Sequence, residues 1–258
     1  MEANPRASRT VPFVSKALSI QMAKAATLIM VGRSIADLKA AAILPAIDGR
    51  HGGGQLIAVK EAVLPFRRFG TLEGRYVDSL LGPEMRSTGE VMGLAPDFPT
   101  AFAKAQAGAN CALPLTGTVF VSVADRDKSQ IVLPIRRLVQ LGYRILATDG
   151  TAKVLARHGI SCERVAKESE AGGGTSIVDM IVNGEVDVVI NTPSGTDARA
   201  DGYAIRAATT AADKSLFTTV AQLSAVIGSF EVVRAGPFEV TSLQEVAVQR
   251  AASNKERV

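Results

Sequence analysis

The feature that most constrains the fold is a pattern of strand, turn and helix that repeats across residues 117–191. It opens with the short, β-branched run Thr-Val-Phe-Val-Ser-Val at 118–123, which predicts a buried strand. Apolar residues at helical spacing follow at 131–139, and a second strand at 143–147 leads directly into a second helix. Because strands that alternate with helices form parallel sheets covered by helices, the pattern predicts an α/β fold.

The same alternation continues beyond this stretch. Further strands are expected at 161–166, 186–190 and 215–217, and further helices at 175–183, 203–212 and 220–227. Residues 239–249 predict a last strand and a short helix. The first five of these strands, with the helices between them, predict a parallel five-stranded sheet with helices on both faces.

Polar side chains gather where the first four of these strands end. In chain order they are Ser122, Lys128, Thr148, Thr151, Lys167 and Asn191. The carboxyl ends of parallel strands meet at one edge of a sheet, where helix N-termini direct N–H groups at anions. Each residue taken singly is better explained as an ordinary turn or N-cap residue. As a set, two lysines and several hydroxyls predict a phosphate pocket.

In the first part of the chain, shorter sequence patterns predict the helices and strands. Helices are expected at 14–31, at 35–42 behind an N-cap at Ser34, and at 98–107, with a strand at 56–66. Residues 80–93 are polar and punctuated by glycine, and are expected to be irregular. A carboxylate, Glu61, lies inside the predicted strand and needs a cationic partner if it is buried.

The N-terminal run combines acidic, amide and basic side chains. Glu2 and Asn4 alternate along an extended segment, so their oxygens face the same side and suit Mg²⁺ held against nucleotide phosphates. Arg6 and Arg9 are suited to phosphate oxygens. The alternative interpretation is a frayed, solvated tail.

Composition narrows the function classes. The net charge is +4, and the lysines and arginines are scattered, which argues against nucleic-acid binding. Two cysteines, Cys111 and Cys162, make no disulfide framework and favour a reducing cytoplasm. No apolar run approaches the ~20 residues of a membrane span.

Three motifs carry a resemblance to a known family. The runs 2–16, 60–66 and 81–93 resemble the closing part of the second ATP-grasp domain in the carbamoyl-phosphate synthase large subunit family. From residue 116 onward the chain resembles that family's regulatory domain, which has the methylglyoxal-synthase-like fold. The resemblance covers nearly the whole chain. It implies a partial ATP-grasp domain at 1–112 and an allosteric domain at 113–258.

The resemblance also implies a role for the N-terminal run. Glu2 and Asn4 match ligands of Mg²⁺ or Mn²⁺, which is bound with ATP, and Arg6 and Arg9 match catalytic residues near its phosphates. The chain lacks the nucleotide-binding lobe of that family, so by itself it is expected to be catalytically incomplete. It would then be a C-terminal fragment, a truncated gene product or one piece of a split large subunit.

Two regulatory sites are implied as well. The six residues at the strand ends match a site for a nucleotide effector, uridylate or inosinate. Pro193 stands where some members have a threonine that contacts the effector, which leaves its identity open. The residues matching an ornithine site between the two domains are Glu61, Leu64, Asp201 and Thr218. The implied partners are the remainder of the large subunit and a glutaminase small subunit, in pyrimidine and arginine biosynthesis.

Two alternative functions remain open from the sequence. A free-standing methylglyoxal synthase is suggested by the run 194–197, which ends in Asp197, but that chemistry needs a catalytic histidine. His51 and His158 both lie far from Asp197 in sequence, so the acid–base partner is missing. An inactive remnant is the other alternative, because a sheet without its companion strands exposes apolar surface.

Overall fold

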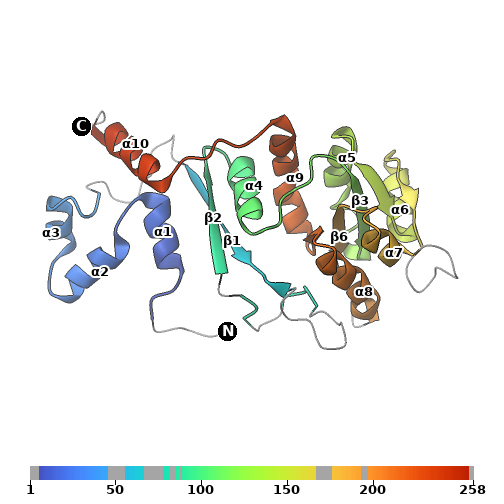
Figure 1. Cartoon of the computed structure of the whole chain (residues 1–258), viewed down its shortest axis with the longest axis horizontal. Coiled ribbons are helices and arrows are strands. Elements are labelled where there is room, and N and C mark those ends of the chain that lie inside the picture. Colours follow the sequence, from blue (N-terminus) through green and yellow to red (C-terminus); the bar gives the residue numbers. More distant parts are fainter. Residues whose placement is uncertain are drawn as a thin grey trace.

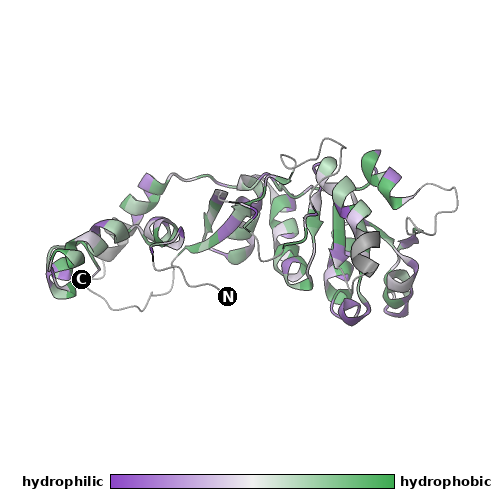
Figure 2. Ribbon diagram, turned by 90° about the horizontal axis from the view of Figure 1, so that it is seen from below, coloured by the Kyte–Doolittle hydropathy of each residue, from purple (hydrophilic) through white to green (hydrophobic). Residues whose placement is uncertain are grey.

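The computed structural model describes residues 6–45, 56–66, 78–81, 85–87, 89–166, 176–192 and 197–255 of the chain. These residues form an elongated arrangement in both ribbon views (Figures 1 and 2). A group of helices lies at one end and a parallel sheet covered by helices at the other. A two-stranded sheet with its helix lies between them.

The parallel sheet has five strands, as the sequence predicts. They are β3 (Thr118–Val123), β4 (Arg144–Ala147), β5 (Glu163–Arg164), β6 (Val188–Thr192) and β7 (Ser215–Phe217). They are hydrogen-bonded in the order β5-β4-β3-β6-β7, and every neighbouring pair is parallel. The central strands β3 and β6 are buried along almost their whole length, so they read as continuous apolar runs rather than as alternating ones. The predicted α/β fold class is confirmed.

Helices cover both faces of this sheet. They are α5 (Val132–Gln140), α6 (Asp149–Arg157), α7 (Ile177–Val182), α8 (Asp197–Ala211) and α9 (Val220–Ala235). Val119 and Val121 of β3 pack on one side in a core that includes residues of α5, α6 and α9. Phe120 packs on the other side, in a second core with residues of α7 and α8. Alternate side chains of one strand therefore serve the two faces.

The middle of the molecule is a two-stranded antiparallel sheet with a helix packed on it. Strand β1 (Ile57–Val63) pairs with β2 (Gly89–Ala95), and α4 (Phe98–Gly108) packs against both. The expectation that residues 80–93 are irregular is wrong for 89–93, which lie in β2. The segment looks irregular in the sequence partly because it contains Gly93. Packing requires this glycine, since a Cβ there would lie 1.9 Å from the carbonyl oxygen of Ala101. Only glycine lets the helix approach the strand this closely.

Helix α4 also joins this sheet to the larger one. Its other side packs against α9. The Ser229 hydroxyl of α9 donates a hydrogen bond to the Pro99 carbonyl at 2.7 Å, and Ser229 is fully buried. Gly228 lies at the same contact, where a Cβ would stand 2.9 Å from Pro99 Cγ. The two sheets are thus connected through one close helix–helix contact.

The terminal helices differ from the prediction in two places. A single helix at 14–31 is wrong, because the chain forms α1 (Thr10–Leu18) and α2 (Met22–Met30) with Ser19 in the left-handed region between them (φ 56°). Helix α3 (Ile35–Ala40) begins at Ser34 as predicted, with a complete capping box to Asp37. At 239–249 the predicted strand is wrong, because residues 237–242 form neither helix nor strand and α10 (Leu243–Lys255) begins directly after them.

Several boundaries in the larger sheet also shift. Strand β5 is shorter than the predicted 161–166, α8 begins at residue 197 rather than 203, and α9 continues to 235 rather than 227. Strand β6 runs through Thr192, so Asn191 lies inside the strand instead of following it. Among the described helices, none has the length and hydrophobicity to cross a membrane.

Candidate functional site

The sheet order creates one place where a ligand is expected. From β3 the chain moves outward through β4 to β5 on one side, and then crosses back to β6 and β7 on the other. The carboxyl ends of β3 and β6 therefore lie side by side at the point where the strand order reverses. Open α/β sheets bind ligands at this point.

Five of the residues predicted for a phosphate site lie at this edge. We call them the carboxyl-edge cluster: Ser122, Lys128, Thr148, Thr151 and Asn191. They come from the ends of β3, β4 and β6, from the turn after β3 and from the first turn of α6. The sixth predicted residue, Lys167, lies outside the described residues, as does Pro193.

Hydroxyl groups form the centre of the cluster. Thr148 Oγ1 lies 3.4 Å from Ser122 Oγ and 3.3 Å from Thr151 Oγ1. Thr148 occupies the N-cap position of α6, but its side chain makes no capping hydrogen bond and is turned toward these hydroxyls. Thr151 is fully buried and accepts a hydrogen bond from the backbone N–H of Val123 at 3.4 Å. The hydroxyls of three elements are therefore held together.

The ammonium group of Lys128 lies over the first turn of α6. A Cβ at Gly150 would lie only 2.7 Å from Lys128 Nζ, so the lysine reaches this position because residue 150 is glycine. Lys128 Nζ also pairs with Asp125 at 2.6 Å. The Lys128 side chain is 19% exposed, whereas that of Asp125 is 95% exposed. The Lys128 side chain is therefore mostly buried, whereas its partner Asp125 is exposed to solvent.

Charge around this turn is mixed. Asp149 stands beside the lysine at the start of α6, and its pKa is lowered chiefly by the hydrogen bond from Lys153. The positive charges of Lys153, Arg164 and Lys128 lower the pKa of Asp149 further. A helix N-terminus carries partial positive charge, which favours anions and disfavours cations. The first turn of α6 therefore combines that partial charge with several cations.

Asn191 connects the cluster to a residue that sequence reasoning missed. Its side-chain Nδ2 donates to the Ser122 carbonyl at 3.4 Å, and its Oδ1 accepts from Arg206 Nη1 at 3.0 Å. Arg206 of α8 is fully buried and forms a bidentate pair with Asp78, with both N···O distances at 2.7 Å. An arginine in an otherwise apolar helical stretch was the available signal. Asp78 is 128 positions away in the chain, so no spacing pattern could have paired the two.

A second group of predicted residues centres on Glu61 of β1. Glu61 is half-buried, and its Oε2 accepts a hydrogen bond from Gln106 Nε2 of α4 at 2.9 Å. Burial raises the pKa of Glu61, although hydrogen bonds from the Ala62 backbone and from Gln106 oppose the shift. Cys111 is exposed as a residue, but desolvation of its thiol and then the charges of Glu61 and Asp213 raise its pKa. The Cys111 thiol therefore lies within electrostatic range of both Glu61 and Asp213, and Asp213 belongs to the turn that connects α8 to β7.

The other residues of that group are only partly linked to Glu61. Leu64 follows β1 and is half-buried. Thr218 follows β7, where its N–H and hydroxyl lie 3.2 and 3.5 Å from Gln222 Oε1. Asp201 belongs to α8, and its side chain lies outside the described part of the chain. Within the described residues, Glu61 and Thr218 have no direct hydrogen bond to each other.

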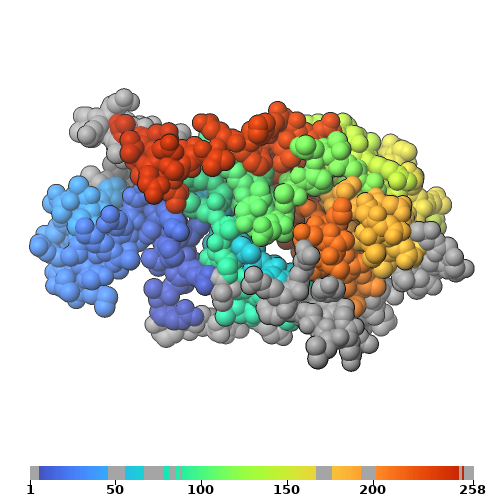
Figure 3. Space-filling model, viewed as in Figure 1, coloured from blue at the N-terminus to red at the C-terminus, as the bar shows by residue number. Residues whose placement is uncertain are grey.

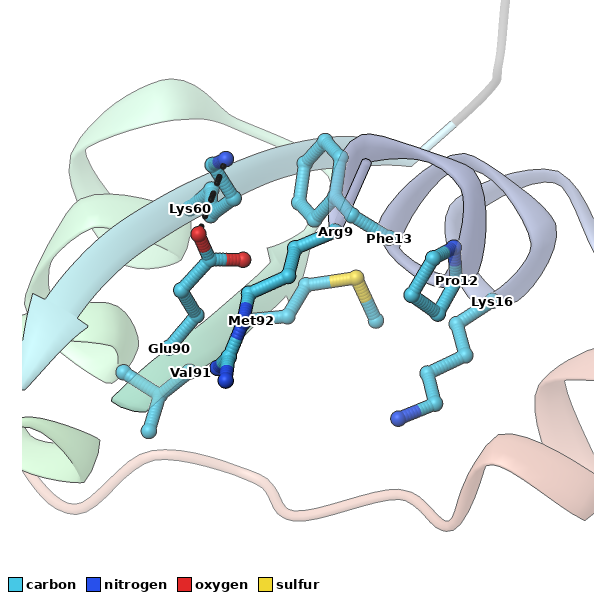
Figure 4. Close-up of a pocket in the computed structure, with 8 residues that line it drawn as sticks. All are labelled: Arg9, Pro12, Phe13, Lys16, Lys60, Glu90, Val91 and Met92. Atoms are coloured by element: carbon cyan, nitrogen blue, oxygen red, sulfur yellow. Dashed lines mark hydrogen bonds and ion pairs between the residues drawn. The ribbon is translucent and has the colours of Figure 1, made fainter. Parts of the chain in front are cut away.

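A third group lines a cavity of about 210 Å³ between α1 and the β1–β2 sheet, which we call the α1 cavity. Three cations surround it, namely Arg9, Lys16 and Lys60, and Lys60 pairs with Glu90 at 3.4 Å. The other lining residues are Pro12, Phe13, Val91 and Met92. Figure 4 shows the side chains of Lys16 of α1 and of Arg9 just before it, and the hollow beside α1 is visible in Figure 3.

The remaining residues predicted for metal and phosphate are less informative. Arg6 is exposed just before α1, and Glu2 and Asn4 lie outside the described residues. Across the described ranges, no three His, Cys, Asp or Glu side chains group closely enough to hold a metal ion. The predicted metal ligands therefore remain a prediction.

In the described part of the chain, the histidine is His158, and it does not lie at the carboxyl-edge cluster. His158 is exposed at the C-terminal end of α6, where its backbone carbonyl accepts a hydrogen bond from Arg136 at 2.9 Å. Thr148 and Thr151 lie at the opposite end of this helix. His51 and the side chain of Asp197 are outside the described part.

Comparison with known proteins agrees with the resemblance seen in the sequence. Residues 130–218 match the family model of the MGS-like domain. The chain is 65% identical to the carbamoyl phosphate synthase large chain of Clavibacter michiganensis subsp. michiganensis over 256 residues, covering 98% of this chain and 23% of that protein. It is 58% identical to the same-named protein of Beutenbergia cavernae over 262 residues, covering 100% of this chain and 24% of that one.

The match therefore covers nearly all of this chain but only a part of each relative. The chain spans about a quarter of the length of the curated relatives that it matches. Among solved structures, methylglyoxal synthase from Elizabethkingia anophelis aligns with 50% of this chain and 89% of its own, with a TM-score of 0.36 and 18% identity.

Proposed function

We propose that this chain is the regulatory part of a carbamoyl phosphate synthase. It matches the large chains of such enzymes over nearly its whole length, and residues 130–218 match the MGS-like domain. In this proposal residues 113–258 bind a nucleoside monophosphate, uridylate or inosinate, at the carboxyl-edge cluster. Residues 1–112 transmit the effect to the ATP-dependent synthase. The remainder of the large chain and a glutaminase small subunit are its partners, in the cytoplasm.

The observation that carries this proposal is the position of Lys128 over the first turn of α6. A cation beside a helix N-terminus is unfavourable by itself, because the helix dipole is positive there. A bound phosphate reverses this, since it accepts hydrogen bonds from the ammonium, from free backbone N–H groups and from hydroxyls. The Thr148 hydroxyl does not cap the helix but lies 3.4 Å from Ser122 Oγ, within the carboxyl-edge cluster. The cluster therefore has the chemistry of a phosphate site.

The test is calorimetric titration of the full chain with uridylate and with inosinate. A charge-assisted hydrogen bond contributes about 1.5–3 kcal/mol, so Lys128→Ala is expected to weaken binding by about tenfold to a hundredfold. Arg157→Ala removes the same charge at the exposed far end of α6 and serves as the matched control. Equal affinities for wild type and Lys128→Ala would remove Lys128 from the site. If wild type binds neither nucleotide, the inactive remnant becomes the better reading.

The second regulatory ligand in the proposal is ornithine, near Glu61, Leu64, Asp201 and Thr218. The supporting observation is the half-buried carboxylate of Glu61, whose pKa is raised by burial. An ammonium group placed beside it would stabilise its charged form. Glu61→Gln keeps the size and the hydrogen bond to Gln106 but removes the charge, so it should abolish ornithine binding while nucleotide binding persists.

The catalytic roles belong to the assembled enzyme. We include Arg6 and Arg9 as groups for ATP phosphates, with Glu2 and Asn4 as ligands of Mg²⁺ or Mn²⁺, once the missing lobes are supplied. The three cations around the α1 cavity support an anionic ligand there. The isolated chain should show no ATP- and bicarbonate-dependent formation of carbamoyl phosphate. Turnover by the isolated chain, free of host enzyme, would contradict this division of roles.

A further inference from the structure

Arg206 is completely buried, and its guanidinium makes hydrogen bonds to two separate parts of the chain. Its guanidinium donates to Asn191 in the carboxyl-edge cluster at 3.0 Å and, through Nε and Nη2, to both carboxylate oxygens of Asp78 at 2.7 Å. A buried cation without such partners would be strongly destabilising. The planar fork of arginine matches a carboxylate in a way that lysine cannot. The contact is therefore specific in geometry.

The fold reserves space for this guanidinium. A Cβ added at Gly202, one turn earlier on α8, would lie 2.3 Å from Arg206 Nη1 and 3.0 Å from Asn191 Oδ1. No side chain fits there while the arginine reaches the asparagine. Glycine in the middle of a helix is destabilising relative to alanine, and here the absence of a side chain leaves the space that the guanidinium occupies.

The contacts form a continuous chain from the ligand edge to another segment. Ser122 accepts from Asn191, Asn191 accepts from Arg206, and Arg206 donates to Asp78. Asp78 in turn accepts a hydrogen bond from the Leu80 backbone N–H at 3.1 Å. Asp78 lies in the segment 78–81, which precedes β2 and is separate from the parallel sheet.

We propose that Arg206 is a positioning residue that couples occupancy of the carboxyl-edge cluster to the conformation of segment 78–81. This rests on the proposed nucleotide binding. A ligand that bonds to Asn191 changes the partner of the guanidinium, and the guanidinium holds the carboxylate that orders Leu80. Coupling of this kind requires different affinities of the ligand for two states, and it acts equally in both directions. Changing Asp78 must therefore change nucleotide affinity, although Asp78 lies outside the cluster.

The test compares the full chain with two aspartate variants. Asp78→Asn is isosteric and removes the charge that faces Arg206. Asp187→Asn is the matched control, since Asp187 also pairs with a cation, Lys214 at 3.1 Å, and also accepts a backbone N–H, that of Thr118 at 2.9 Å. Asp187 lies at the amino end of β3, away from the ligand edge. Uridylate and inosinate affinities are measured by calorimetry, and exchange of the Leu80 amide is measured with and without nucleotide.

We expect Asp78→Asn to weaken nucleotide binding about tenfold, which corresponds to about 1.4 kcal/mol, and Asp187→Asn to change it less than twofold. In wild type the nucleotide should slow exchange of the Leu80 amide, and in Asp78→Asn it should not. A merely structural role of Asp78 predicts a lower melting temperature with the nucleotide effect on Leu80 intact.

Gly202→Ala gives a second route, because it displaces the guanidinium and leaves every charge in place. It too should weaken nucleotide binding and abolish the effect on Leu80. If wild type binds nucleotide and both Asp78→Asn and Gly202→Ala keep its affinity and its effect on Leu80, the coupling role is wrong while the proposed function stands. If wild type binds neither nucleotide, both proposals are overturned.

Discussion

Substitution of Gly150 by alanine should separate stability from ligand binding. Gly150 lies in the first turn of α6, where its φ angle is not in the left-handed region. Alanine is therefore compatible with the backbone, and it favours helix by up to about 1 kcal/mol over glycine. The melting temperature of the Gly150→Ala variant should stay the same or rise.

Ligand binding should respond in the opposite direction. The new Cβ would lie 2.7 Å from Lys128 Nζ, which is too close for a non-bonded contact, so the flexible lysine tip must move away from the helix. Loss of the charge-assisted hydrogen bond from Lys128 to the phosphate would remove about 1.5–3 kcal/mol of binding free energy. Uridylate or inosinate should then bind about tenfold to a hundredfold more weakly.

The assay combines calorimetric titration with thermal unfolding of the same samples. Gly108→Ala at the end of α4 is the control, since the atoms nearest its Cβ would be Val91 side-chain atoms at an ordinary 3.5 Å. It should leave nucleotide affinity unchanged. Gly150→Ala with wild-type affinity would refute the placement of Lys128 beside the phosphate. A lower melting temperature in Gly150→Ala would show that the contact is structural.

Two further predictions concern the middle of the molecule. Gly93→Ala should destabilise the chain by at least the 1–3 kcal/mol typical of overpacking, because its Cβ would meet the backbone of α4 at 1.9 Å; a urea midpoint equal to wild type would contradict the packing of α4 on β2. Because burial raises the pKa of Glu61 in the folded state, the unfolded state releases its proton first and the free energy of unfolding should fall as the pH rises above about 4.5, up to the raised pKa. Glu61→Gln should remove this part of the pH dependence, and an unchanged profile would exclude Glu61 as its source.

The strands of the parallel sheet were predictable for a physical reason. Strands β3 and β6 are buried on both faces, so their apolar runs stand out in the sequence. The approximate place of the candidate site followed from the same fact, because the carboxyl ends of neighbouring parallel strands must meet. Residues as far apart as Ser122 and Asn191 could therefore be grouped without a structure.

The elements that were missed depend on contacts that no local pattern records. Strand β2 reads as a loop because Gly93 accommodates a helix that comes later in the chain. The break between α1 and α2 occurs at Ser19, a residue type that does not demand a left-handed conformation. The pairing of Arg206 with Asp78 joins residues 128 positions apart. Each depends on tertiary packing rather than on periodicity.

The central claim is that a nucleoside monophosphate binds at the carboxyl-edge cluster through its phosphate. The most direct measurement is the change in backbone amide NMR shifts when uridylate or inosinate is added to the full chain, with uridine and inosine as controls that lack the phosphate. The account predicts saturable shifts concentrated at Lys128, Gly150 and Thr151, and little response to the nucleosides. Shifts concentrated instead at the α1 cavity, or equal shifts with nucleotide and nucleoside, would contradict it.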